Sequence, residues 1–266
     1  MKFLFPFLLC LLVSAMASAQ DLDRYAAATF THESYSLNYR ILYPSKIDSG
    51  RKYPVLVYLH GAYERGRDNT LPLTAGGAFF LQPDMQETYP SIVIFPQCPT
   101  DDVWAWFDTD LDSTTGLAKK WYFPFRKDPT RVSGALMALL DSLLTVPYAD
   151  PDRVYIGGYS QGGMGVFDLV ARYPDFFAAG FPISGAGNVT TTRSFAGKVP
   201  LWIFHGRLDQ VVPPRFSRDY YRRLKKAEAE VRYTEYPELG HNLWQRVFSE
   251  KELWAWIYAQ SKLSGR

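Results

Sequence analysis

Ser160 is the residue of this chain whose neighbours best equip it to act as a nucleophile. It lies between Gly158 and Gly162 in a Gly-x-Ser-x-Gly pattern. The apolar run 154–156 before the pattern predicts a buried strand, and residues 161–173 after it predict a helix. Glycines permit a tight turn between the two, which holds the hydroxyl exposed at the positive end of the helix. The pattern therefore predicts a nucleophile elbow; the alternative is a glycine-rich turn with an incidental serine.

A serine hydroxyl becomes a good nucleophile only when a base takes its proton, and a histidine does this best beside a carboxylate. Proteins with such an elbow carry these groups in the chain order serine, acid, histidine. Two histidines, His205 and His241, follow the serine, but His205 precedes every plausible acid. Asp209 comes directly after a predicted strand, and His241 follows the next one. The sequence thus predicts the catalytic triad Ser160, Asp209 and His241.

Each partner of the serine also has a plainer interpretation. Asp209 is alternatively a turn carboxylate that caps the next helix, and His241 an exposed loop histidine. Three other carboxylates between the serine and His241 are interpreted as charges on helix surfaces or helix ends: Asp168, Asp175 and Asp219. Coincidence is a poor explanation of three suitable residues in the right order at the ends of strands.

Acyl transfer also needs hydrogen-bond donors for the negative charge that develops on the carbonyl oxygen. The backbone N–H of Gln161, directly after the nucleophile, is one expected donor. The second is expected in the loop 60–66, which follows a strand ending at Leu59, and Ala62 is the natural candidate. His60 opens this loop, but it precedes both serine and acid, so we interpret it as a structural residue that braces the loop.

Two charged groups near these elements have more than one interpretation. Glu64 and Arg65 either contact the substrate or pair internally and make the loop more rigid. Residues 108–112 are acidic enough to suggest a calcium loop, but Ser113 and Lys119 stand where an EF-hand requires Gly and Glu. We therefore expect a solvated acidic loop and no metal site.

Apolar runs bounded by turn residues alternate with helical stretches along most of the chain. The expected strands are 35–43, 54–59, 91–95, 154–156, 179–182, 199–204 and 231–236. The expected helices are 130–144, 161–173, 214–227 and 250–260. Nearly continuous apolar strands are typical of parallel sheets that are covered on both faces. The pattern predicts an α/β fold with a mainly parallel central sheet and helices on both faces.

The stretch 97–129 is the irregular part of this pattern and is rich in aromatic side chains. It leaves the sheet at the C-terminal end of a strand, which is the edge where open α/β sheets bind ligands. Aromatic faces stack well on sugar rings or phenolic groups. Most of these rings are expected to pack the segment onto the domain, with Trp104, Trp106 and Trp244 as the exceptions that bind substrate. The stretch itself contains Trp104, Trp106, Trp121, Tyr122 and Phe123.

The first 19 residues have the features of a secretory signal peptide. Lys2 is followed by an apolar run over 3–13 and by small residues at 17–19 that form a cleavage site. The apolar run is too short to span a bilayer comfortably. We expect a secreted or periplasmic protein in which 20–266 forms one domain, with a long loop insertion at about 97–129.

Composition excludes several classes of protein. The formal charge of the 266 residues is +2, or +1 without Lys2, which favours neither nucleic acid nor an acidic membrane surface as a partner. Only Cys98 remains after removal of the signal, so no intramolecular disulfide is expected. No second long apolar segment follows the signal. The expected partner is a small-molecule or carbohydrate ester substrate.

Together these motifs resemble those of the α/β-hydrolase superfamily. They lie at 59–66, 158–163, 205–209 and 240–241. The Glu-Arg-Gly after His-Gly, and Trp244 shortly after the histidine, narrow the similarity to secreted esterases allied to prolyl-oligopeptidase-like hydrolases and to feruloyl and acetylxylan esterases. The similarity runs from about Tyr35 to the final helix. It implies an α/β-hydrolase fold and a serine carboxylesterase without metal or organic cofactor, acting through an acyl-enzyme on short-acyl or carbohydrate-linked esters.

Two other functions are compatible with the same residues. The first is a prolyl-oligopeptidase-like peptidase of short peptides, although the chain has no β-propeller of the kind that such peptidases carry. The second is a non-catalytic protein that reuses the scaffold for binding. Against the second, every position of the triad and the oxyanion loop holds a competent residue.

Overall fold

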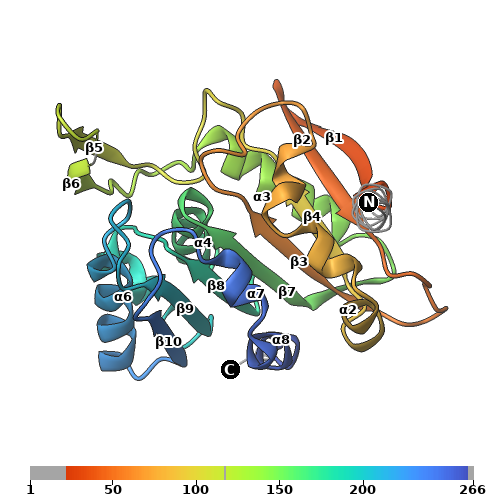
Figure 1. Cartoon of the computed structure of the whole chain (residues 1–266). Helices are drawn as coiled ribbons and strands as arrows, with labels where there is room; N and C mark the ends of the chain where they lie inside the picture. The colour runs from red at the N-terminus through yellow and green to blue at the C-terminus, as the bar shows by residue number, and fades with distance from the viewer. Residues whose placement is uncertain (1–21, 117, 263–266) are drawn as a thin grey trace, which may run out of the picture.

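The structure is a computed structural model that describes residues 22–116 and 118–262. The predicted signal peptide lies outside the described residues. An eight-stranded sheet forms the centre of the molecule, and a separate two-stranded sheet lies above one end of it (Figure 1). The mainly parallel sheet with helices on both faces confirms the predicted fold class.

The order of the strands across the sheet differs from their order in the chain. Across the sheet they are β1 (Ala26–His32), β2 (Tyr35–Leu42), β4 (Ile92–Pro96), β3 (Tyr53–Leu59), β7 (Ala149–Tyr159), β8 (Ala179–Ile183), β9 (Leu201–Gly206) and β10 (Val231–Tyr236). The pairs β1–β2 and β2–β4 are antiparallel, and every neighbouring pair from β4 to β10 is parallel. The C-terminal ends of the parallel strands therefore meet at one edge of the sheet.

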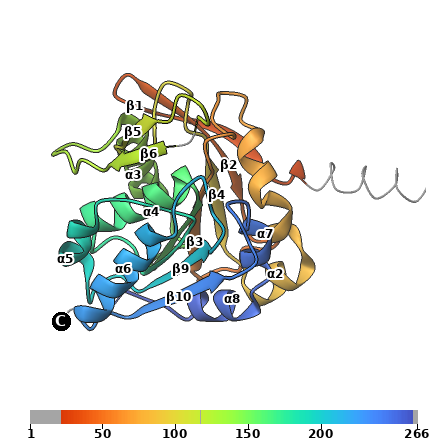
Figure 2. The same cartoon turned by 60° about the vertical axis from the view of Figure 1, so that its left-hand side comes forward.

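Helices form a layer on each face of this sheet (Figures 1 and 2). One layer contains α3 (Arg131–Leu143), α4 (Gln161–Arg172), α5 (Thr192–Phe195) and α6 (Arg215–Lys226), with the short η3 (Val189–Thr191). The other contains η1 (Leu71–Ala75), η2 (Gly77–Leu81), α2 (Pro83–Thr88), α7 (Trp244–Phe248) and α8 (Lys251–Tyr258). Within the described residues, no helix is both long and apolar enough to cross a membrane.

Alternation along β3 shows how one strand serves both layers. Val55 and Val57 belong to the core under α3 and α4, whereas Leu56 and Tyr58 belong to the opposite core with Phe248. Successive strand side chains point to opposite faces, so a continuous apolar run fills two cores at once. This burial on both faces explains why the central strands were readable from composition alone.

The stretch 97–129 differs from the irregular loop that the sequence predicts. It contains an antiparallel hairpin of β5 (Asp108–Leu111) and β6 (Ala118–Tyr122) that projects above α4 and α6 (Figures 1 and 2). Its strands are short and mostly polar, so they lack the apolar run by which the other strands are recognised. β1 was missed as well, since most of its side chains are exposed.

Candidate active site

The turn between β7 and α4 has the backbone of a nucleophile elbow. Ser160 joins the two elements with φ 57° and ψ −116°, a backbone conformation that residues other than glycine rarely adopt. A Cβ on Gly158 would lie 2.5 Å from the carbonyl oxygen of Gly162, and one on Gly162 would overlap the carbonyl of Leu59. Only glycine fits at 158 and 162, two residues before and after the serine, as the sequence predicts, and the strain is stored at the point where the hydroxyl is presented.

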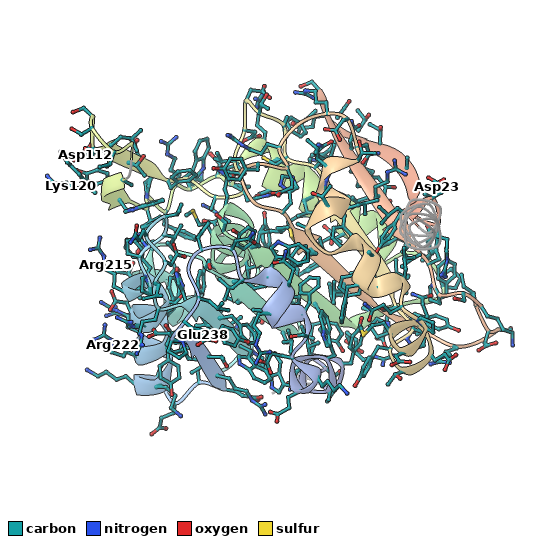
Figure 3. The ribbon with its side chains drawn as sticks, in the orientation of Figure 1. Asp23, Asp112, Lys120, Arg215, Arg222 and Glu238 are labelled. Carbon is teal, nitrogen blue, oxygen red and sulfur yellow. The ribbon has the colours of Figure 1, made fainter. Side chains whose placement is uncertain are left out.

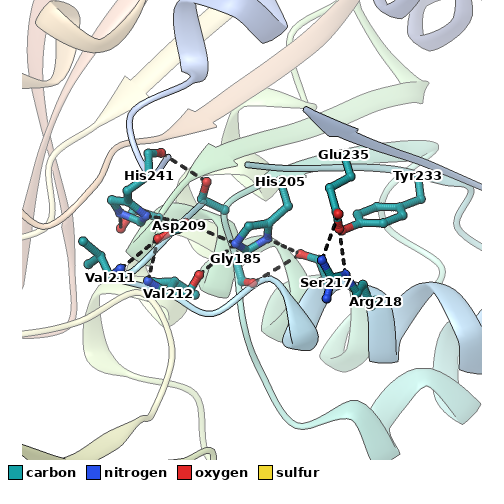
Figure 4. A network of polar contacts seen from close by, with 12 residues as sticks. Gly185, His205, Asp209, Val211, Val212, Ser217, Arg218, Tyr233, Glu235 and His241 are labelled. Atoms are coloured by element: carbon teal, nitrogen blue, oxygen red, sulfur yellow. Dashed lines mark hydrogen bonds and ion pairs between the residues drawn. The ribbon is translucent and has the colours of Figure 1, made fainter. Parts of the chain in front are cut away.

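The structure brings the three predicted triad residues into one hydrogen-bonded chain. Ser160 Oγ lies 2.9 Å from His241 Nε2, and His241 Nδ1 lies 2.7 Å from Asp209 Oδ2. A carboxylate only accepts, so Nδ1 carries the proton and Nε2 is free to accept the serine proton. Figure 4 shows the imidazole of His241 directed at the carboxylate of Asp209. This arrangement is competent for nucleophilic catalysis.

Asp209 is the most completely satisfied group of the site. Its side chain is fully buried, and its Oδ1 accepts the backbone N–H groups of Val211 and Val212 at 2.9 Å each. Burial by itself would raise the pKa of Asp209, but hydrogen bonds from His205 and His241 outweigh it and hold the pKa well below its ordinary value. The carboxylate is therefore ionised throughout the range in which a histidine can act as a base.

Two backbone contacts fix the loop of the acid against the loop of the histidine. The N–H of Leu208 donates to the carbonyl of Leu239 at 2.9 Å, and the N–H of Arg207 donates to that of Tyr236. Directly after β8, the hydroxyl of Ser184 donates to the carbonyl of His241 at 3.2 Å. The relative positions of acid and base are thus set by hydrogen bonds between loops rather than by the two side chains alone.

The predicted oxyanion donors come from segments that touch. Gln161 is the first residue of α4, where backbone N–H groups have no partner within the helix. A Cβ on Gly162 would lie 2.7 Å from the carbonyl oxygen of His60, so the loop that carries Ala62 lies against this first turn. The two predicted donors thus belong to adjoining segments, and the helix N-terminus adds a favourable dipole for an oxyanion.

Arg65 and Glu64 both turn inward onto the oxyanion loop. Arg65 donates to the carbonyl of Ala62 at 3.2 Å and to that of Thr100 at 3.3 Å, joining this loop to the start of the 97–129 stretch. Burial raises the pKa of Glu64, while hydrogen bonds from its own N–H and that of Gly61 lower it. For Arg65 the structure favours internal bracing, whereas the buried Oε2 of Glu64 has no hydrogen-bond partner in the structure.

His60 is hydrogen-bonded to the same loop and to the start of the 97–129 stretch. Its fully buried ring accepts the N–H of Cys98 on Nε2 at 3.0 Å, so Nδ1 carries the proton that is donated to the carbonyl of Gly61. Burial lowers the pKa of His60 to about 4, which keeps the ring neutral. The structural role expected for His60 agrees with this geometry.

The three tryptophans that were expected to bind substrate have different surroundings. Trp104 is fully buried, with its Nε1–H donated to the carbonyl of His60 and its Cβ against Gly165. Its predicted contact with substrate is therefore wrong, because the segment enters the core at this point. Trp106 is partly exposed, donates to the carbonyl of Asp128 at 3.1 Å and has a guanidinium stacked on its ring.

Trp244 lies in the opposite layer. It is partly exposed and lines a cavity of about 720 Å³ between η1, η2 and α2 on one side and α7 and α8 on the other. Neither Ser160 nor Asp209 nor His241 belongs to the lining of this cavity. A role of Trp244 in binding the substrate of the triad has no support from this position.

A further aromatic group packs near the loop of the acid and the first turns of α4, and three of its four rings come from the stretch 97–129. Four residues close to the triad or in the start of the stretch form a small buried cluster: Ala105, Met164, Ala186 and Val212. Four partly buried rings pack on it: Phe107, Trp121, Phe123 and Phe216. Trp121 and Phe123 stack at 5.8 Å, and the buried Nε1–H of Trp121 has no hydrogen-bond partner in the structure. The sequence showed these aromatics but not which of them would pack together in this cluster.

The acidic loop at the tip of the hairpin is held by internal contacts. Asp112 accepts the N–H groups of Thr114 and Thr115 and pairs with Lys119 at 2.9 Å. Figure 3 places Asp112 and Lys120 at this outer end of the molecule, away from the sheet. Among residues 22–116 and 118–262, no group of three or more His, Cys, Asp or Glu is arranged to hold a metal ion.

The sequence of this chain is similar to those of known carboxylesterases. Residues 51–252 match the family model described as Phospholipase/Carboxylesterase. A probable carboxylesterase of Oryza sativa subsp. japonica is 26% identical over 230 residues, which cover 79% of this chain and 80% of the relative. The similarity therefore includes the elbow, the acid loop and the histidine loop.

Solved structures show the same architecture. The crystal structure of a thermostable esterase is 32% identical, with a TM-score of 0.81 over 91% of this chain, and this chain spans 64% of that protein's length. Pyrococcus horikoshii acylaminoacyl peptidase is 17% identical, with a TM-score of 0.62 over 91% of this chain and 42% of its own. The second likeness is one of fold alone.

Proposed function

This chain belongs to the phospholipase/carboxylesterase family of α/β-hydrolases, and we propose that it is a serine esterase that hydrolyses carboxylic esters through a covalent acyl-enzyme. One observation carries the proposal: an unbroken hydrogen-bonded chain links Ser160 Oγ through His241 to the buried carboxylate of Asp209. A strained serine at a helix N-terminus, with a base and a buried acid in line, serves no evident structural purpose.

The first half of the reaction acylates the serine. Ser160 Oγ attacks the ester carbonyl carbon, and its proton passes to Nε2 of His241 as the C–O bond forms. Asp209 stabilises the imidazolium, and the N–H groups of Gln161 and Ala62 bind the oxyanion. The tetrahedral intermediate then expels the alcohol, which takes the proton from His241 as it leaves.

The second half releases the acid. A water molecule gives one proton to His241 and attacks the acyl carbon, forming a second tetrahedral intermediate on the same donors. When this intermediate collapses, the bond to Ser160 Oγ breaks, the serine recovers its proton from His241, and the carboxylic acid departs. The enzyme returns to its starting state without a metal or an organic cofactor.

Short-acyl or carbohydrate-linked esters of the acetyl or feruloyl type are the proposed substrates. The rings of Trp121 and Phe123 pack on the buried cluster that contains Met164, from the first turns of α4, and this supports an aromatic wall near the serine. Flat apolar faces suit an aryl acyl group or a sugar ring. The signal-like N-terminal sequence supports a secreted or periplasmic site of action.

Two assays test the function. Hydrolysis of short acyl p-nitrophenyl esters is expected to exceed that of prolyl-aminoacyl amides by orders of magnitude, and a fluorophosphonate is expected to label Ser160. The ester assay and the label answer different questions, because faster amide cleavage with normal labelling would identify a peptidase. If the fluorophosphonate failed to label the folded protein, Ser160 would not be a reactive nucleophile, and the whole proposal would be overturned.

A further inference from the structure

A second histidine lies against the carboxylate of the triad. His205, the fifth residue of β9, is fully buried, and its Nε2 lies 3.1 Å from Asp209 Oδ2. This is the same oxygen that accepts Nδ1 of His241, so one carboxylate oxygen stands between two imidazoles (Figure 4). Sequence reasoning set His205 aside because it precedes the acid, which rules it out as the base but not as a partner of the acid.

The hydrogen bonds of His205 fix where its proton lies. Nε2 is also 2.9 Å from the carbonyl oxygen of Val212, so both neighbours of this nitrogen are acceptors and Nε2 must be the donor. On the other side of the ring, Nδ1 lies 2.7 Å from Ser217 Oγ of α6. The hydroxyl of Ser217 is 3.4 Å from the carbonyl of Gly185, so the nearer Nδ1 is its better acceptor. A neutral ring with its proton on Nε2, shared between these two acceptors, and with Nδ1 accepting from Ser217 satisfies both ring nitrogens.

We propose that His205 is a positioning residue of the triad: its Nε2–H, which is shared between the carbonyl of Val212 at 2.9 Å and Asp209 Oδ2 at 3.1 Å, keeps Oδ2 in line with His241, and Ser217 fixes the ring tautomer that makes this possible. The inference rests on the proposed esterase function. Backbone N–H groups already occupy Oδ1, and within the described part of the chain Oδ2 is contacted by His205 and by the catalytic base. A carboxylate held at both oxygens cannot rotate away when the base becomes charged.

Other charged groups around this pair are accounted for. On β10, Glu235 is held by a bidentate ion pair with Arg218 of α6 at 2.7 and 2.8 Å and by the hydroxyl of Tyr233 (Figure 4). At the end of β7, the ring of Tyr159 packs 5.2 Å from that of His241. Burial raises the pKa of Tyr159, so its hydroxyl stays neutral. Besides His205, His241 is thus the titratable side chain that contacts Asp209 Oδ2.

The test compares two substitutions of similar size. His205→Gln keeps an N–H donor at about the reach of Nε2, whereas His205→Leu fills the same space without one. The leucine variant is expected to lose roughly ten- to hundred-fold in kcat on a p-nitrophenyl ester with KM unchanged, as for one lost hydrogen bond to a charged group. The glutamine variant is expected to stay within a few-fold of wild type.

The pH profile separates positioning from packing. In the leucine variant, Asp209 loses the N–H of His205 that partly neutralises its negative charge. The carboxylate therefore stabilises the charged form of His241 more strongly. The acid limb of kcat/KM is then expected to move to higher pH in the leucine variant and to stay in place in the glutamine variant. A residue that only packs the core would lower the melting temperature and leave this limb unmoved.

Ser217 provides a second route in case the buried leucine prevents folding. Ser217→Ala removes the hydroxyl that fixes the tautomer, so a smaller loss of kcat and a shift of the acid limb in the same direction are expected, with rescue by Ser217→Thr. The proposal is overturned if both His205 variants are equally impaired with unshifted profiles. It is also overturned if the His205→Leu or the Ser217→Ala variant matches wild type in kcat and acid limb. Fluorophosphonate labelling of Ser160 in wild type distinguishes these outcomes from failure of the esterase function itself.

Discussion

Ser160 combines backbone strain with an exposed reactive atom, and this combination makes its role directly testable. Ser160→Ala is expected to reduce ester hydrolysis by several orders of magnitude, because the members of a triad act as a unit. The elbow backbone does not depend on the hydroxyl, so the melting temperature is expected to stay close to that of wild type. Ser142→Ala, at an exposed position of α3, is the matched control. A Ser160→Ala variant that kept a tenth of wild-type kcat would rule out this nucleophile.

Asp209 allows a graded test at the same scale. Asp209→Asn is expected to lower kcat by roughly 10³- to 10⁴-fold, because an amide cannot stabilise the imidazolium and invites the wrong tautomer of His241. The loss is expected to be smaller than for Ser160→Ala. Asp219→Asn is the control, since Asp219 pairs with Arg222 on the surface of α6. Steady-state kinetics in which the control variant is the crippled one would show that the acid is misassigned.

The oxyanion loop is braced by His60, whose ring must remain neutral. The stability of the protein is therefore expected to fall in acid in a way that depends on this residue. The pKa of His60 is about 4 in the folded state and roughly 6.5 in the unfolded chain, so the unfolded state binds the proton first. The free energy of unfolding contributed by this group is complete above about pH 6.5 and is lost as the pH falls toward 4, at up to about 1.4 kcal/mol per pH unit.

Replacing His60 by glutamine is expected to remove that part of the pH dependence while lowering stability at pH 7. Urea unfolding of wild type and variant from pH 4 to pH 7.5 measures the difference directly, since all other titrating groups are shared. Parallel stability curves for the two proteins would mean that His60 is able to take up its proton in the folded state.

The hairpin stretch contains the aromatic wall proposed for the substrate. Trp121→Ala is expected to lower kcat/KM for aryl or sugar esters by roughly ten- to two-hundred-fold relative to acetate esters of small alcohols, as for one lost apolar contact. Trp104→Ala is the structural comparison, because its ring lies in the core. That variant is expected to lose activity equally across the ester series and to melt at a lower temperature. Equal losses for Trp121→Ala across the same series would show that its ring only holds the hairpin down.

At the scale of the whole molecule, the sheet and the two helical layers hold loops from β7, β9 and β10 at one edge. The proposed export of this domain predicts that the mature protein begins at Gln20. Expression of the full sequence in a bacterial host with an intact secretion pathway, followed by mass spectrometry of the recovered protein, checks this. Recovery of the intact 266-residue chain from the cytoplasm would contradict the predicted signal peptide.

The nucleophile and the fold class could be predicted from the sequence because they depend on local order. Ser160 lies in a strand–turn–helix whose glycines, apolar run and helix all fall within about twenty consecutive residues. The triad order added Asp209, three residues after the end of β9, and His241, five residues after the end of β10. Nearly continuous apolar strands, which are buried on both faces, indicate a parallel sheet by their composition alone.

Contacts between distant segments decided the rest. Trp104 lies in the core because Gly165 and His60 leave room for its ring there, whereas Trp121 reaches the neighbourhood of the elbow on a hairpin with polar strands. The contact of His205 with Asp209 likewise depends on a turn that brings a strand residue back against its own loop, and on Ser217 from the next helix. Such positions follow from how segments pack in three dimensions, and no spacing along the chain encodes which of several aromatic or histidine side chains a fold will turn toward the site.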